Sequence, residues 1–80
     1  MRVDKFLKNS RLIKRRSVAK EACDSGRISV NDRVAKAGTD VEVGDVICIR
    51  FGTHEITARV LQLKESQRRE DAANMYEIID

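Results

Sequence analysis

Eight basic side chains occur among the first twenty residues, which contain one acidic residue, Asp4. The bases are Arg2, Lys5, Lys8, Arg11, Lys14, Arg15, Arg16 and Lys20. This segment has a formal charge of +7, whereas the other sixty residues hold eight bases and twelve acids, a formal charge of −4. Ammonium and guanidinium groups gathered at one end of a chain bind phosphates, so this distribution favours nucleic acid as a partner.

Apolar residues are regularly spaced among these bases. Within residues 3–22 they are Val3, Phe6, Leu7, Leu12, Ile13, Val18, Ala19 and Ala22. Disordered basic tails contain few such residues, so the charge belongs to a folded surface. The alternative is a solvated face that only keeps the protein in solution, but the separation of positive from negative charge favours binding of a polyanion.

The apolar spacing predicts a first short helix. Val3, Phe6 and Leu7 have the i, i+3, i+4 spacing of one helical face. Asp4 lies near its start, where a carboxylate suits the positive end of the helix dipole. A break is predicted at residues 9–10, an Asn-Ser pair whose side chains compete for backbone hydrogen bonds.

A second helix is predicted over roughly residues 15–25. Gly26 then suits the left-handed conformation that follows many helices. The predicted buried stripe of this helix consists of Val18, Ala19, Ala22 and Cys23.

Three bases fall at the start of this second helix, where cations oppose the helix dipole. They are Lys14, Arg15 and Arg16, and no Ser, Thr or Asp occupies the expected cap at Arg15. A bound phosphate would reverse the cost, since it would meet backbone N–H groups and positive side chains together. Lys20 lies one helical turn after Arg16 and extends the same face. We therefore expect that replacing Arg16 with Ala weakens binding and leaves thermal stability unchanged or slightly raised.

Beyond the helices the apolar period changes to two, which predicts antiparallel strands. Residues 28–30 alternate, residues 31–32 form a tight turn, and residues 33–36 return beside the first strand. Further strands are predicted over residues 46–51 and 56–63.

The aromatic side chains are few. Phe6 and Phe51 lie on apolar faces and are assigned to the core, which leaves Tyr76 as the ring expected to be exposed. His54 is assigned to a solvated loop. This supply of rings is too poor for a surface that stacks the bases of single strands.

The end of the chain predicts a short polar helix over residues 66–74 and a final edge strand over residues 75–79. The predicted fold class is therefore α+β, with two N-terminal helices packed on a small, mostly antiparallel sheet, followed by a short C-terminal helix and an edge strand.

Eighty residues suit one domain, with little room for an enclosed active-site cavity. We expect a single RNA-binding domain over residues 1–80, with a core motif at residues 1–51 and C-terminal strands and tail at residues 52–80.

Cysteine and histidine are too sparse for a usual metal site. Cys23 and Cys48 are far apart, and His54 is the one histidine, so neither a metal nor another cofactor is expected. Both thiols are expected to be buried or half-buried. No apolar run approaches the ~20 residues of a membrane span or forms a signal peptide, which predicts a cytoplasmic protein without membrane contact.

RNA is favoured over DNA as the polyanion. A two-helix unit could act as a helix-turn-helix, whose second helix reads the major groove of DNA. The outer face of the second helix instead offers Glu21 and Asp24 after its basic start. Arginines at a helix start suit recognition of the shape and phosphates of folded RNA.

Four segments resemble the RNA-binding domain named for ribosomal small-subunit protein four. They are residues 2–7 (RVDKFL), 15–20 (RRSVAK), 26–31 (GRISVN) and 44–47 (GDVI). The resemblance implies an αL architecture, in which the basic helical surface binds RNA. The Asn-Asp turn at residues 31–32 departs from the usual Asn-Gly.

The whole chain is similar to the RqcP family of stand-alone domains, and also to the fifteen-kilodalton heat-shock protein, whose basic C-terminal extension it lacks. The resemblance implies a non-enzymatic factor of ribosome-associated quality control. Such a factor binds obstructed large ribosomal subunits at P-site peptidyl-tRNA and rRNA. It supports alanine tailing of stalled chains together with RqcH, which delivers alanyl-tRNA. We expect a monomer.

The candidate RNA-binding residues implied by the family motif are Arg2, Arg11, Arg15 and Arg16, with Lys5, Lys14 and Lys20 added. Three other classes of function stay open: a general ribosome-recycling or ribosome-assembly protein, a constitutive ribosomal protein, and a DNA-binding regulator. An enzyme is disfavoured, because the sequence lacks a nucleophile–base set and a glycine-rich phosphate loop.

Overall fold

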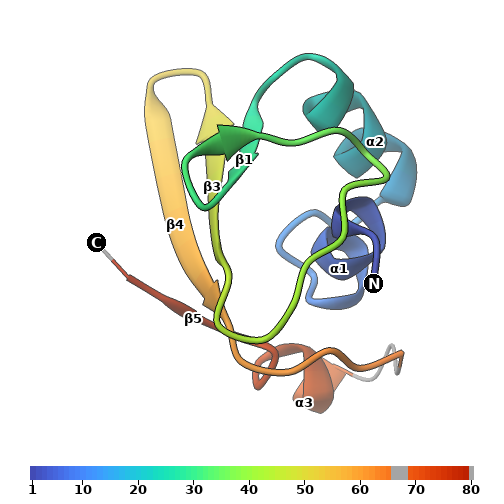
Figure 1. Ribbon diagram of the computed structural model, residues 1–80. Helices are drawn as coiled ribbons and strands as arrows, with labels where there is room; N and C mark the ends of the chain where they lie inside the picture. Colours follow the sequence, from blue (N-terminus) through green and yellow to red (C-terminus); the bar gives the residue numbers. More distant parts are fainter. Residues whose placement is uncertain (66–68, 80) are drawn as a thin grey trace.

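Residues 1–65 and 69–79 are described by the computed structural model. The elements are α1 (Val3–Asn9), α2 (Arg16–Asp24), β1 (Ile28–Val30), β2 (Arg33–Val34), β3 (Val46–Phe51), β4 (His54–Val60), α3 (Arg69–Ala72) and β5 (Tyr76–Ile78). The strands form one antiparallel sheet in the order β2-β1-β3-β4-β5. Helices α1 and α2 pack together on one side of this sheet, which confirms the predicted α+β fold (Figure 1).

Both N-terminal helices form where the apolar spacing predicts them. Val3, Phe6 and Leu7 of α1 are fully buried, and the helix ends at Ser10, whose N–H donates to the carbonyl of Phe6 at 2.8 Å. Helix α2 buries the predicted stripe except at Val18, which is 46% exposed. Val18 lies in the first turn of α2, where side chains point toward the helix N-terminus and past the packed elements. Its assignment to the core is wrong.

Left-handed residues mark the predicted turns. Gly26, after α2, has φ +80°, and residues 31–32 between β1 and β2 have φ 52° and 69°. Two successive positive φ angles are typical of the two-residue hairpin turn, and Asn and Asp both tolerate that region. An Asn-Asp pair therefore serves here where Asn-Gly is usual.

Strand β2 is shorter than predicted, because the chain leaves the sheet to cover the N-terminus. The N–H groups of Val3 and Val41 donate to the carbonyls of Thr39 and Met1 at 2.7 and 2.9 Å. Ala35, Ala37 and Val41 are buried by this arrangement. The segment after β2 thus closes the core over α1 (Figure 1).

Three side-chain assignments need correction, two beside the turn between β3 and β4 and one in β5. Phe51 is 41% exposed, because it ends β3 beside the Gly52 turn. His54 pairs with Phe51 and begins β4, so it is an exposed strand residue rather than a loop residue. Tyr76 is half-buried against the core, so its assignment as the exposed ring is wrong.

The C-terminal part returns to the sheet edge. Strand β4 ends at Val60 rather than at residue 63, since the N–H groups of residues 61 and 62 donate to the carbonyl of Met75. Within the predicted helix of residues 66–74, α3 spans Arg69–Ala72, and residues 66–68 lie outside the described part of the chain. Strand β5 pairs with β4 at the edge, as predicted. Among the described residues, no helix has the length and apolarity needed to cross a membrane.

Candidate nucleic-acid interface

A buried carboxylate joins the two helices of the basic segment. Asp4 in α1 is 2% exposed, and its two oxygens accept two contacts from Arg2: Nε to Oδ1 at 3.2 Å and Nη2 to Oδ2 at 3.3 Å. Arg16 of α2 approaches the same carboxylate, with Nε at 3.6 Å from Oδ2. Two arginines distant in the sequence are therefore held at one acid.

The arginines of this Asp4 cluster remain accessible. The side chains of Arg2 and Arg16 are 51% and 48% exposed, although the carboxylate between them is buried. A carboxylate that holds one edge of each guanidinium restricts its rotamers and lowers the entropy lost when a phosphate binds. The cluster can therefore act as a preorganised pair of phosphate-binding groups.

The cluster changes the expectation for Arg16. The sequence predicts that this side chain opposes the helix dipole without compensation. The carboxylate of Asp4 provides part of the missing negative charge, so Arg16 contributes to the packing of α2 against α1 as well as to the basic surface. Removal of Arg16 should therefore lower stability, and the expected neutral or stabilising effect is no longer supported.

The start of α2 has the open cap that the sequence predicts. Arg15 is the N-cap, with extended backbone (φ −116°, ψ 131°) and no side-chain cap hydrogen bond, and no acid lies in the first turn. Lys14, Arg15 and Lys20 are exposed and have no ion pair within residues 1–65 and 69–79. These three side chains and the Asp4 cluster form the basic surface of the two helices, the α1–α2 surface.

Lys5 is positioned differently from the other candidates. Its ammonium contacts the carboxylate of Glu65, and its side chain is 37% exposed. The contact links α1 to the segment after β4 and neutralises part of the charge. Lys5 therefore offers less positive charge to a phosphate than the exposed bases Lys14, Arg15 and Lys20.

The loop between the helices gathers a second basic group. Arg11 has φ 62°, and a small hollow of about 130 Å³ is lined by Lys8, Asn9, Arg11 and Lys14. Arg11 and Lys14 are predicted site residues, whereas Lys8 and Asn9 are not. The spacing of three residues between Lys8, Arg11 and Lys14 is the signal that could have indicated a common location.

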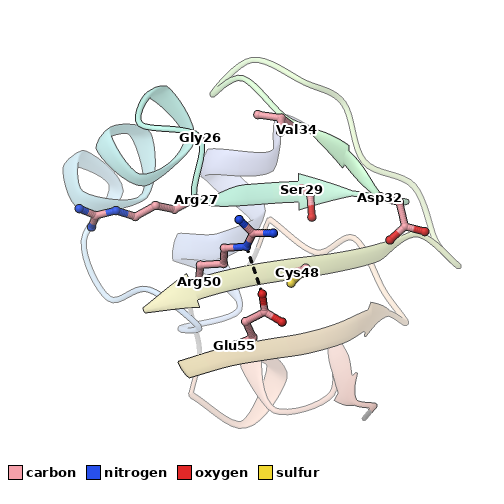
Figure 2. Close-up of a pocket in the computed structure, with 8 residues that line it drawn as sticks. All are labelled: Gly26, Arg27, Ser29, Asp32, Val34, Cys48, Arg50 and Glu55. Carbon is pink, nitrogen blue, oxygen red and sulfur yellow. Dashed lines mark hydrogen bonds and ion pairs between the residues drawn. The ribbon is translucent and has the colours of Figure 1, made fainter. Parts of the chain in front are cut away.

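The sheet face away from the helices has mixed charge. A hollow of about 260 Å³ lies on this face, and Arg50 of β3 is paired there with Glu55 of β4 at 3.1 Å. Figure 2 shows this pair with Asp32 at the other end of the hollow. Acids and bases alternate here, unlike the helical side. The sheet face therefore offers less to a polyanion than the α1–α2 surface.

The two thiols are buried or half-buried, as predicted. Cys23 is fully buried and Cys48 is half-buried in the sheet-face hollow. Burial raises the pKa of the Cys23 thiol to about 11, and the carboxylates of Asp4 and Asp24 contribute in the same direction. No group of three or more metal-ligating side chains occurs within the part of the chain that the structure covers.

Known proteins resemble this chain in sequence and in structure. The S4 domain family model matches residues 1–47. A Streptococcus pneumoniae protein named RQC P-site tRNA stabilizing factor is 57% identical over 79 residues, which cover 99% of this chain and 90% of that protein. A Bacillus subtilis protein of the same name is 56% identical over 79 residues, with 99% and 92% coverage.

A solved structure extends the comparison. Heat Shock Protein 15 of Vibrio cholerae, described as trimeric, superposes with a TM-score of 0.90 at 30% identity. The match covers 99% of this chain and 81% of that one.

Proposed function

Because this chain belongs to the S4 domain family, we propose that it is a non-enzymatic RNA-binding factor of ribosome-associated quality control that stabilises P-site tRNA. One observation carries the proposal: relatives named for this role are 56–57% identical to the chain across 99% of its length. The exposed arginines of the Asp4 cluster and the uncapped start of α2 support it physically, since both suit phosphate groups.

The finer role follows the same proposal. The factor binds obstructed large ribosomal subunits in the cytoplasm, contacts peptidyl-tRNA and neighbouring rRNA through the α1–α2 surface, and supports alanine tailing by RqcH. The bound anions are phosphates of a folded RNA, and the residues are those of the predicted set: Arg2, Lys5, Arg11, Lys14, Arg15, Arg16 and Lys20. Five to seven phosphate contacts would give a log–log salt slope of roughly −4 to −6.

Copurification tests the function directly. Tagged protein from cells in which translation is stalled should carry large subunits that retain peptidyl-tRNA. Arg2→Ala should reduce this recovery, because Arg2 is half exposed in the Asp4 cluster. Arg33→Ala is the matched control, since it removes the same charge from an exposed position in β2 that is not one of the predicted RNA-binding residues.

Two outcomes contradict the proposal. If large subunits without peptidyl-tRNA are recovered in the same amount as subunits that retain it, the alternative role in general recycling or assembly is indicated. Recovery unaffected by Arg2→Ala, together with a salt slope near −1, would refute binding through the basic surface.

A further inference from the structure

The hollow at the end of α1 is lined by positive charge. Lys8, Arg11 and Lys14 provide three bases around it, and Asn9 is the fourth lining residue. No acid is among these lining residues. An anion that entered the hollow would therefore meet cations without a competing carboxylate in its lining.

Asn9 has an unsatisfied hydrogen-bonding group. The residue is 2% exposed, and its Nδ2 donates to the carbonyl of Lys64 at 3.3 Å. Its Oδ1 has no hydrogen-bond partner among the described residues. Exchange of the amide oxygen and nitrogen would place Oδ1 against the Lys64 carbonyl, so the assignment is physically determined.

A buried carbonyl oxygen without a donor destabilises the folded state. Val3, Phe6 and Leu7 of the same helix are buried and apolar, and the buried oxygens of Asp4 have partners, so the unpaired Oδ1 of Asn9 is unlike the other buried groups of α1. A polar side chain here is explained if a ligand provides the donor. Asn9 lines the hollow, so a hydroxyl group bound there would lie beside this amide and can provide the donor that Oδ1 lacks.

A ribonucleotide combines the two groups that this hollow lacks. Its backbone phosphate suits Lys8, Arg11 and Lys14, and its ribose 2′-hydroxyl is a hydrogen-bond donor that DNA does not have. Building on the proposed function, we propose that this hollow is a ribonucleotide subsite, in which the three bases bind a backbone phosphate and Asn9 Oδ1 accepts from the 2′-hydroxyl. The subsite gives the α1–α2 surface a means to prefer RNA over DNA.

Binding to an RNA hairpin and to a DNA hairpin of the same sequence tests the subsite, with affinity measured by fluorescence anisotropy over a range of KCl concentrations. Asn9→Leu keeps the volume and removes the acceptor. It should weaken RNA binding about 3- to 10-fold and leave DNA binding unchanged, although it also removes the Nδ2 donor to the carbonyl of Lys64. Lys8→Gln and Lys14→Gln should each reduce the salt slope for both hairpins by about 0.9.

Arg2→Ala separates this inference from the proposed function. If Arg2→Ala weakens RNA binding while the Asn9 and lysine variants leave the RNA-to-DNA ratio and the salt slope unchanged, the subsite is overturned and the function stands. Wild-type protein that binds neither hairpin also overturns the subsite, and copurification of large subunits then decides the function. If Asn9→Leu does not fold, the exposed Lys14→Gln still tests the phosphate part, and Asn9→Ser tests the acceptor.

Discussion

Replacement of Asp4 with Asn separates the amount of positive charge from its arrangement. The substitution removes a negative charge and raises the formal net charge by one from +3. If charge alone governed the affinity for RNA, binding would become tighter. If the Asp4 carboxylate positions Arg2 and Arg16, binding should become weaker, because the Asn amide is uncharged and has one acceptor oxygen instead of two.

The geometry sets the expected loss of stability. Asp4 is 2% exposed, and each lost hydrogen bond to a charged group costs about 1.5–3 kcal/mol. The two arginines are about half exposed and can be rehydrated, so the loss should be below the ~3–5 kcal/mol typical of a fully buried pair. A total of about 2 kcal/mol corresponds to a decrease of roughly 8–16 °C in the thermal midpoint for a domain of this size.

Two measurements check this prediction: thermal unfolding by circular dichroism, and binding to large ribosomal subunits below the unfolding temperature. We expect about tenfold weaker binding for Asp4→Asn, equivalent to ~1.4 kcal/mol. Asp32→Asn is the matched control, since it changes the charge equally at an exposed position with φ 69°, which Asn tolerates. Binding by Asp4→Asn as tight as that by Asp32→Asn, with an unchanged thermal midpoint, would refute the positioning role of the carboxylate.

Four further predictions follow from the same structure. Arg16→Ala should lower the free energy of unfolding by about 0.5–1.5 kcal/mol, because its half-exposed contact with Asp4 is lost, and urea titration checks this; a gain in stability would contradict it. Ellman's reagent should label half-buried Cys48 rapidly and buried Cys23 only on unfolding. The Cys23→Ala and Cys48→Ala proteins each keep one thiol, and equal labelling rates for the two would contradict the prediction. Because the raised pKa of Cys23 favours its protonated form in the folded state, stability should fall as the pH rises from about 9 toward 11, and Cys23→Ala should flatten that decline in urea titrations. Gly26→Ala should lower the free energy of unfolding by about 1–2 kcal/mol through backbone strain at φ +80°. Beyond the adjoining residues no atom lies within 4 Å of the added methyl group, so no steric clash adds to this loss, and an unchanged thermal midpoint would argue against the prediction.

Local patterns in the sequence predicted most of the fold. The apolar spacing of α1, the left-handed glycine after α2 and the tight turn at residues 31–32 depend on neighbours within a few residues. Those interactions are expressed in periodicity and turn chemistry, so they can be interpreted without coordinates. The same is true of the separation between the basic N-terminal segment and the acidic remainder.

The misassigned side chains share a physical cause. Val18 and Phe51 fit the periodicity of their elements but lie where each element extends past its packing partners. Tyr76 fits an exposed edge but packs on the core. Periodicity identifies which face of an element is apolar, whereas burial also requires another element opposite that residue.

The sequence alone therefore determined a folded, positively charged two-helix surface and, through its motif segments, the family. Tertiary structure decided how that surface is organised. It brought Arg2 and Arg16 to one buried carboxylate, paired Lys5 with Glu65, and gathered Lys8 and Asn9 beside the loop bases. These contacts join residues on different elements, and their geometry depends on how α1 packs against α2 and the segment after β4, which no local pattern encodes.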